Sequence, residues 1–381
     1  MQVAQVVLPM SGAWRDAEFA PLQAIRPSLV LAFGSVGHFA DKALGARLAA
    51  LFPGATLAGC STAGEISSQG VAQGSLCVTA VAFSSVTCAS ATTRLASMED
   101  SRGAGERLGE ALSRPGLRSV LVFGPGVSIN GSALVQGVAS RVGAGVPITG
   151  GLAGDDGAFR TTYTVARDGV ASDCLVAVGF YGESLQFGHG SFGGWEPFGP
   201  SRKVTRCAGN VLYELDGEPA LEVYKRYLGE YARDLPASGL LFPFEMLGRD
   251  GGSAGLIRTI LGVSDADGSL TLAGEIDPNG YLRLMHASTD KLVDGAEAAA
   301  DAASRMFSGA QDGLVLLVSC VGRKLVMGDR VDEEVEAVGD VFGGHATLAG
   351  FYSYGEISPF APGGECRLHN QTMTITCFGE S

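Results

Sequence analysis

Three glycine-containing turns, each ending in a carboxylate, carry side chains suited to ligand chemistry. The first turn runs from Gly59 through Cys60 to Gly64 and Glu65. Its pattern of Leu-Ala-Gly, four residues and Gly-Glu-Ile returns in the stretch that ends with Glu356, and a looser copy ends with Asp155. A pattern repeated at this length indicates internal duplication.

The turns predict a ligand pocket if they converge. Carboxylates beside glycine backbone would bind an amine, such as that of an amino acid, through charge-assisted hydrogen bonds. The alternative is that each carboxylate accepts hydrogen bonds from the amides of its own turn. The predicted ligand-binding residues are Cys60, Gly64, Glu65, Asp155, Tyr352, Tyr354 and Glu356.

Cys60 also suggests an enzyme, because a thiol on a bend after a strand resembles a nucleophile. The enzyme would be a cysteine hydrolase, but the residues around Cys60 argue against it. The turn does not fit G-x-S-x-G, no partner base is identifiable, and Phe351 stands at the equivalent place in the last copy. We therefore expect no catalytic residue, and the hydrolase stays an alternative.

A glycine-rich stretch from Phe187 to Pro200 offers a second kind of site. Its histidine, His189, lies between two glycines. Neutral imidazole is the usual axial donor to haem iron, and aromatic rings nearby would wall a flat apolar ligand. The alternative is that the aromatics fill core and His189 caps a turn; His345 is the reserve ligand. The predicted haem-binding residues are Phe187, His189, Phe192 and Trp195.

Composition limits the class of protein. Hydrophobic residues make up 46% of the 381 residues and charged residues 18%, enough for a large core. The net charge of −13 argues against nucleic acid and anionic membranes as partners. No signal peptide or membrane-length apolar run is recognisable. Eight cysteines without a CxxC pair favour free thiols in a reducing cytoplasm.

Strand and helix patterns surround each turn in the same order. Each copy has a buried strand, an amphipathic helix and a second strand. The distance from the first strand to the turn glycine is 30 residues in the first two copies, from Leu29 to Gly59 and from Val120 to Gly150. In the third copy, from Leu314 to Gly350, it is 36 residues. Units of this size are right-handed β-α-β crossovers. They predict an α/β fold of two modules, with largely parallel buried sheets and outer helices.

Four motifs in order along the chain resemble the FIST sensory domain pair of bacterial signal transduction. They are Gly59–Ile66, Val204–Tyr224, Gly350–Ile357 and Leu368–Ile375. The resemblance implies a lead-in over 1–27, a FIST N-module over 28–235 and a C-module over 236–381. It implies a cytoplasmic sensor that binds a small ligand and passes its state to a kinase, cyclase or chemoreceptor.

No kinase or other output segment is recognisable beside the two modules, so the chain is also similar to stand-alone FIST proteins that sense nitric oxide. That likeness implies haem, with His189 as its metal ligand, and a partner histidine kinase. The alternative in the same class is an amino-acid or metabolite sensor without haem. The sequence leaves the ligand, the partner and the oligomeric state open, a homo-oligomer included.

Overall fold

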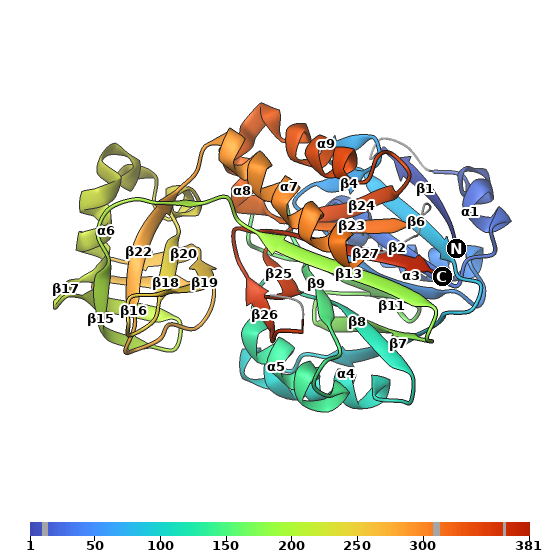
Figure 1. Cartoon of the computed structure of the whole chain (residues 1–381), viewed down its shortest axis with the longest axis horizontal. Helices are drawn as coiled ribbons and strands as arrows, with labels where there is room; N and C mark the ends of the chain where they lie inside the picture. The colour runs from blue at the N-terminus through green and yellow to red at the C-terminus, as the bar shows by residue number, and fades with distance from the viewer. Residues whose placement is uncertain (10–13, 308–312, 361–362) are drawn as a thin grey trace.

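Three similar sheets surround a common core in the computed structural model, which describes residues 1–9, 14–307, 313–360 and 363–381 (Figure 1). Within these ranges the strands form three six-stranded sheets and a nine-stranded sheet. The nine-stranded sheet forms a separate domain at one end of the molecule, at the left of Figure 1.

Three repeats with the same order of elements build the three smaller sheets. Repeat 1 comprises β1 (Gln2–Leu8), α1 (Ala20–Ala24), β2 (Leu29–Gly34), α2 (Val36–Ala40), α3 (Ala43–Leu51), β3 (Thr56–Ser61), β4 (Glu65–Ser67), β5 (Gly70–Ala72) and β6 (Leu76–Ala82). Repeat 2 comprises β7 (Thr87–Arg94), α4 (Ser101–Leu112), β8 (Leu117–Gly124), α5 (Gly131–Val142), β9 (Ile148–Leu152), β10 (Thr164–Ala166), β11 (Gly169–Ala171) and β12 (Cys174–Tyr181). Repeat 3 comprises β13 (Leu185–Phe192), α7 (Thr289–Met306), β23 (Leu314–Cys320), α8 (Val321–Met327), α9 (Asp332–Val341), β24 (Thr347–Ser353), β25 (Gly355–Pro359), β26 (Cys366–His369) and β27 (Met373–Glu380).

The predicted α/β class with β-α-β repeats is confirmed. Each repeat has one parallel pair in the middle of its sheet: β2 with β3, β8 with β9, and β23 with β24. These strands are apolar and buried because helices cover one face and the shared core covers the other. The strands around each parallel pair run antiparallel. The prediction of largely parallel sheets is therefore wrong, because each repeat contributes one β-α-β crossover and its other strands join the sheets in antiparallel pairs.

The hairpin after each turn pairs with the sheet of a different repeat. Strand β4 of repeat 1 pairs with β24 of repeat 3. Strand β25 of repeat 3 pairs with β9 of repeat 2, and β10 of repeat 2 pairs with β3 of repeat 1. The exchange closes a ring of three, so the turns that precede the hairpins must lie close to one another.

Aromatic side chains from the three repeats meet in the middle of the shared core. The ring centroids of Phe33 and Phe351 lie 4.8 Å apart, and those of Phe33 and Phe123 lie 5.4 Å apart. All three side chains are fully buried. Rings from separate repeats in contact tie the three sheets together, since each large aromatic side chain removes much apolar surface from water.

The separate domain is an insertion in repeat 3 between β13 and α7. It comprises β14 (Glu196–Pro197), β15 (Arg202–Ala208), β16 (Val211–Leu215), β17 (Glu218–Pro219), α6 (Ala220–Leu228), β18 (Phe244–Leu247), β19 (Ser253–Arg258), β20 (Ile260–Ser264), β21 (Ser269–Leu272) and β22 (Tyr281–His286). It has its own apolar core between α6 and the sheet. The module boundary that the sequence predicts, at 235–236, lies inside this inserted domain.

The residues around His189 form a regular strand, so His189 does not cap a turn. Residues 185–192 form strand β13, which pairs along its length with β27. Its glycines let helix α7 approach closely, because a Cβ at Gly188 or Gly190 would lie 2.4 or 2.0 Å from a carbonyl oxygen of the helix. These glycines therefore serve helix packing.

We predict that Gly150→Ala destabilises the protein. A Cβ at Gly150 would lie 2.0 Å from the carbonyl oxygen of Val122, and Gly59 and Gly350 stand in the same way against neighbouring strands. Forcing such a contact should lower the free energy of unfolding in urea by about 2 kcal/mol or more. The control is Gly339→Ala in α9, where the nearest atom would be 3.6 Å away. There the change should be stabilising by up to about 1 kcal/mol; equal effects at the two sites would contradict the prediction.

Candidate functional site

The three turns are joined by hydrogen bonds between their main chains. The amide of Ala63 donates to the carbonyl of Tyr352 at 2.8 Å, and the amide of Tyr352 donates to Gly64 at 2.9 Å. The amide of Gly154 donates to the carbonyl of Ser61 at 2.8 Å, and the Ser61 hydroxyl donates back to the Gly154 carbonyl at 2.8 Å. The expected convergence of the turns is confirmed.

The convergent turns fill the space between them. A Cβ at Gly154 would lie 2.6 Å from the amide nitrogen of Ala63, so the two main chains are in direct contact. Three well-formed cavities of the described residues lie at other places, and none of these three is lined by Glu65, Asp155 or Glu356. The geometry therefore places these carboxylates within a packed junction.

Glu65 and Glu356 hold equivalent structural positions. Glu65 accepts hydrogen bonds from the Thr62 hydroxyl at 2.5 Å and from the amide and hydroxyl of Ser75 at 2.9 and 2.7 Å. Glu356 accepts from the Ser353 hydroxyl at 2.6 Å and from the amide and hydroxyl of Thr372 at 3.2 and 3.0 Å. Each side chain thus links its turn to the closing strand of its repeat, as the turn-capping alternative describes.

Burial changes the acidity of both glutamates. Glu356 is fully buried, and this burial raises its pKa to about 8. Burial also raises the pKa of Glu65, although hydrogen bonds from Thr62 and Ser75 oppose the rise. The raised pKa favours the protonated, neutral form of Glu356 in the folded protein, and that form lacks the negative charge that an amine ligand would require.

Asp155 and the two tyrosines are occupied in a similar way. Asp155 accepts a hydrogen bond from the hydroxyl of Tyr354. It also accepts hydrogen bonds from the backbone amides of Phe159 and Arg160, each at 2.7 Å. Tyr352 donates its hydroxyl to the buried Glu334 at 2.5 Å. Tyr354 therefore binds the second turn, and Tyr352 binds helix α9.

Cys60 and Gly64 complete the set of turn residues. The Cys60 side chain is fully buried in the core shared by the three sheets, and burial raises its pKa well above the ordinary value for a thiol. A thiol in this setting is not the thiolate that nucleophilic attack requires. A Cβ at Gly64 would lie 3.0 Å from the Lys324 ammonium nitrogen, which donates to the Ala63 carbonyl at 2.6 Å.

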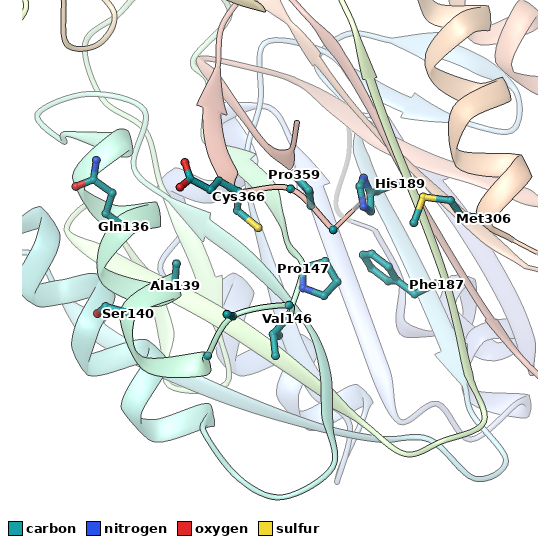
Figure 2. Close-up of a pocket in the computed structure, with 16 residues that line it drawn as sticks. Gln136, Ala139, Ser140, Val146, Pro147, Phe187, His189, Met306, Pro359 and Cys366 are labelled. Atoms are coloured by element: carbon teal, nitrogen blue, oxygen red, sulfur yellow. The ribbon is translucent and has the colours of Figure 1, made fainter. Parts of the chain in front are cut away.

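His189 and Phe187 line the largest of the three cavities, of about 690 Å³ (Figure 2). Strand β13 presents both side chains on the face away from α7, and Met306, at the end of α7, faces the same cavity (Figure 2). The opposite wall comes from the loop 143–147 and from residues 363–366. His189 is 4% exposed, and burial lowers its pKa to about 4, so the imidazole is neutral at pH 7. Within the described residues it makes no hydrogen bond.

Phe192 and Trp195 lie at a different cavity, of about 330 Å³, beside the inserted domain. Trp195 is buried and donates its indole N–H to the carbonyl of Gln371 at 2.7 Å, whereas Phe192 is 54% exposed. The four residues predicted to bind haem are therefore divided between two cavities. Phe187 and His189 share one cavity, and Phe192 and Trp195 share the other.

The sequence did not indicate the other walls of the His189 cavity. Met306 ends an alanine-rich helix, and the loop 143–147 connects α5 to β9. The pairing of β25 with β9 brings residues 363–366 to the same cavity as the loop 143–147, although the two segments lie far apart in the sequence. A charged or unusual side chain would have marked these segments, but the walls are mostly small or apolar residues.

A three-repeat α/β core with an inserted domain matches two sequence profiles. The FIST N domain matches residues 28–218 and the FIST C domain matches residues 220–359. The chain therefore belongs to the FIST family. FIST domains are generally sensory domains of signal transduction that bind small ligands. Among the described residues, no helix combines the length and the apolar character needed to cross a membrane.

The relatives that match parts of the chain do not refine this assignment. The chain is 40% identical over 92 residues to an uncharacterized protein of Methanocaldococcus jannaschii, covering 23% of this chain and 17% of that protein. It is 28% identical over 191 residues to one from Mycobacterium tuberculosis, covering 49% of each, and 26% identical over 266 residues to one from Mycobacterium bovis, covering 68% and 64%. The chain thus spans less than two thirds of each relative.

A cyanuric acid hydrolase structure from A. caulinodans aligns over 99% of both chains with 9% identity and a TM-score of 0.37, too weak a likeness to establish catalysis.

We predict that the buried glutamates make the fold less stable as pH rises. Glu356 has a folded pKa raised to about 8 from 4.5, so folding favours its protonated form and this stabilisation is lost between pH 4.5 and 8. His189 and His369, with pKa values lowered to about 4, act in the opposite direction only below pH 6.5. Between pH 6.5 and 8 the free energy of unfolding should therefore fall in the wild type and fall less in Glu356→Gln.

The matched control for this titration is Glu336→Gln, which removes an exposed carboxylate from helix α9. It should keep the wild-type slope in urea unfolding measured at several pH values. A Glu356→Gln slope equal to that of the wild type and the control would contradict a buried, protonated Glu356.

Proposed function

We propose that this chain is a sensor whose small ligand binds the His189 cavity, and whose bound state is passed to a partner signalling protein, with a histidine kinase as the specific candidate. Membership of the FIST family supports the sensory role. The observation that carries the site is His189 itself. A neutral imidazole without a hydrogen bond, on the wall of a cavity of about 690 Å³, has a free donor or acceptor to offer a ligand.

Haem is the occupant we propose, with nitric oxide as the signal. The donor chemistry fits, because His189 supplies a neutral imidazole and Met306 a thioether, both of which serve as axial ligands of haem iron. Phe187, Pro147 and Pro359 offer apolar surface to a flat ring. Haem would supply the gas-binding iron. Among the described residues that line the cavity, Glu365 is the only charged one, so they provide no cationic partner for the haem propionates.

The cavity also lies on a path toward the inserted domain. Strand β13 carries His189 and continues into Gly193, at the start of the connection to that domain. Arg323 forms a fully buried ion pair with Glu334. It also donates to the carbonyl of Gly193, on the connection into the domain, and to that of Leu292, in the first turn of α7 just after the chain returns from the domain. A ligand that moves β13 would therefore shift the populations of domain positions that a partner protein reads.

The amino-acid alternative and the cysteine hydrolase have weaker support. Both oxygens of Glu65 and of Glu356 already accept hydrogen bonds in the packed junction. The buried Cys60 thiol lies in the apolar core of the three sheets. The function that the geometry supports best is ligand sensing at the His189 cavity.

We predict that reconstitution with haem gives a Soret band that depends on His189. His189→Ala should abolish the band or weaken haem binding at least tenfold, because the iron loses its imidazole donor. His345→Ala is the matched control, since His345 is exposed in a glycine turn, and it should keep the band. Absorbance titration with haem measures the effect in the three proteins.

Two outcomes would contradict the haem proposal: a wild type that gives no Soret band, or a band that survives in His189→Ala. The wider proposal of a sensor at this cavity has its own test. A screen of metabolites by thermal shift should yield a ligand that raises the melting temperature of the wild type but not of His189→Ala. Stabilising ligands whose effect is the same in both proteins would place sensing elsewhere.

A further inference from the structure

Arg258 is a buried guanidinium that has only main-chain partners. It ends strand β19 in the inserted domain and is 4% exposed. Its Nε donates to the carbonyl of Glu275 and its Nη1 to that of Ile257, both at 3.3 Å. Within the described part of the chain it forms no ion pair. Most of its five N–H donors are thus left for another acceptor.

The electrostatic setting of Arg258 favours an added anion. A buried charge without a counter-ion is unfavourable, and a bound carboxylate would relieve that cost. Burial, together with repulsion from Arg367, lowers the pKa of Arg258 to about 10, and attraction to Glu275 offsets only part of this. Glu275 therefore attracts the guanidinium, but within the described residues its carboxylate forms no ion pair with Arg258.

Arg258 faces a cavity of about 350 Å³ between the inserted domain and the core. Met246, Leu256 and Ile276 contribute apolar surface from the inserted domain, and Leu368 contributes it from β26. A ligand in this cavity would therefore contact a guanidinium at one end and apolar side chains along its body.

The other charged groups of the cavity limit the charge of its ligand. Glu275, Asp277 and Glu365 also line the wall, and Glu365 pairs with Arg367 at 3.1 Å. These carboxylates would repel a dianion such as phosphate more strongly than a singly charged ligand. Guanidinium pairs with a planar carboxylate through two parallel hydrogen bonds.

We propose that this cavity binds a small monocarboxylate with an apolar body, and that the carboxylate pairs with Arg258. The ligand would touch the inserted domain on one side and α5 and β26 on the other, so it would fix the domain against the core. The site is separate from the His189 cavity, although Gln136, Glu365 and Cys366 line both. The proposal does not depend on what binds His189.

Gly274 provides a way to move Arg258 without removing it. The glycine adopts φ +138°, and a Cβ there would lie 2.7 Å from Nε of Arg258. An alanine at this place would push the guanidinium away from its position. Gly274→Ala therefore tests the geometry of the site while it keeps the positive charge.

The experiment titrates the full chain with sodium benzoate and with sodium hexanoate by calorimetry, and measures thermal shifts at matched ionic strength. At least one of these carboxylates should bind the wild type and raise its melting temperature, while sodium phosphate should not. Arg258→Met should weaken that binding at least tenfold. Arg206→Met is the control, because Arg206 is an exposed arginine of the same domain that pairs with Glu214, and it should bind as the wild type does.

The proposal is overturned if neither carboxylate binds the wild type, if binding survives in Arg258→Met, or if phosphate stabilises as much as the carboxylates do. If Arg258→Met does not fold, Gly274→Ala replaces it and should show the same tenfold loss. His189→Ala should keep carboxylate binding. This result separates failure of the carboxylate site from failure of the proposed sensor cavity.

Discussion

The exchange of hairpins among the three repeats is the constraint on which the structure depends. Each parallel strand pair gains an edge partner from another repeat: β4 pairs with β24, β25 with β9, and β10 with β3. None of the three sheets is complete without the others, so the repeats must fold as one unit. The same pairing draws the turns together, so that main-chain hydrogen bonds join Ala63 to Tyr352 and Gly154 to Ser61.

Because the three turns pack against one another at the centre of the molecule, the cavities lie away from that junction. The turns fill their own junction, and there Glu65 and Glu356 link each turn to the closing strand of its repeat. The three cavities lie elsewhere, beside the β25–β26 hairpin and at the border of the inserted domain. His189 and Arg258 are buried groups with unused donors, and both face cavities there. A sensor built in this way would couple ligand binding to the position of the inserted domain.

Much of this fold could be predicted from the sequence, because local patterns encode it. Apolar runs such as Leu314–Val318 marked the buried strands, and the repeated Leu-Ala-Gly marked the turns. Strand β13 could not be predicted in this way. Its glycines are explained by their close packing against helix α7, which lies about 100 residues further along the chain. The site was harder still: His189 was recognisable by type, but its cavity comes from separate repeats. Arg258, a single charge in an apolar strand, was a signal that could have been used.

The closed centre can be tested most directly by native-state hydrogen exchange of the turn amides. If the ring of exchanged hairpins holds the three repeats together, the amides of Ala63, Gly154 and Tyr352 should exchange only through global unfolding. Their free energies of exchange should match the free energy of unfolding, while the amides of the loop 143–147 exchange much faster. Turn amides that exchange as fast as that loop would show an open, mobile centre and contradict the account.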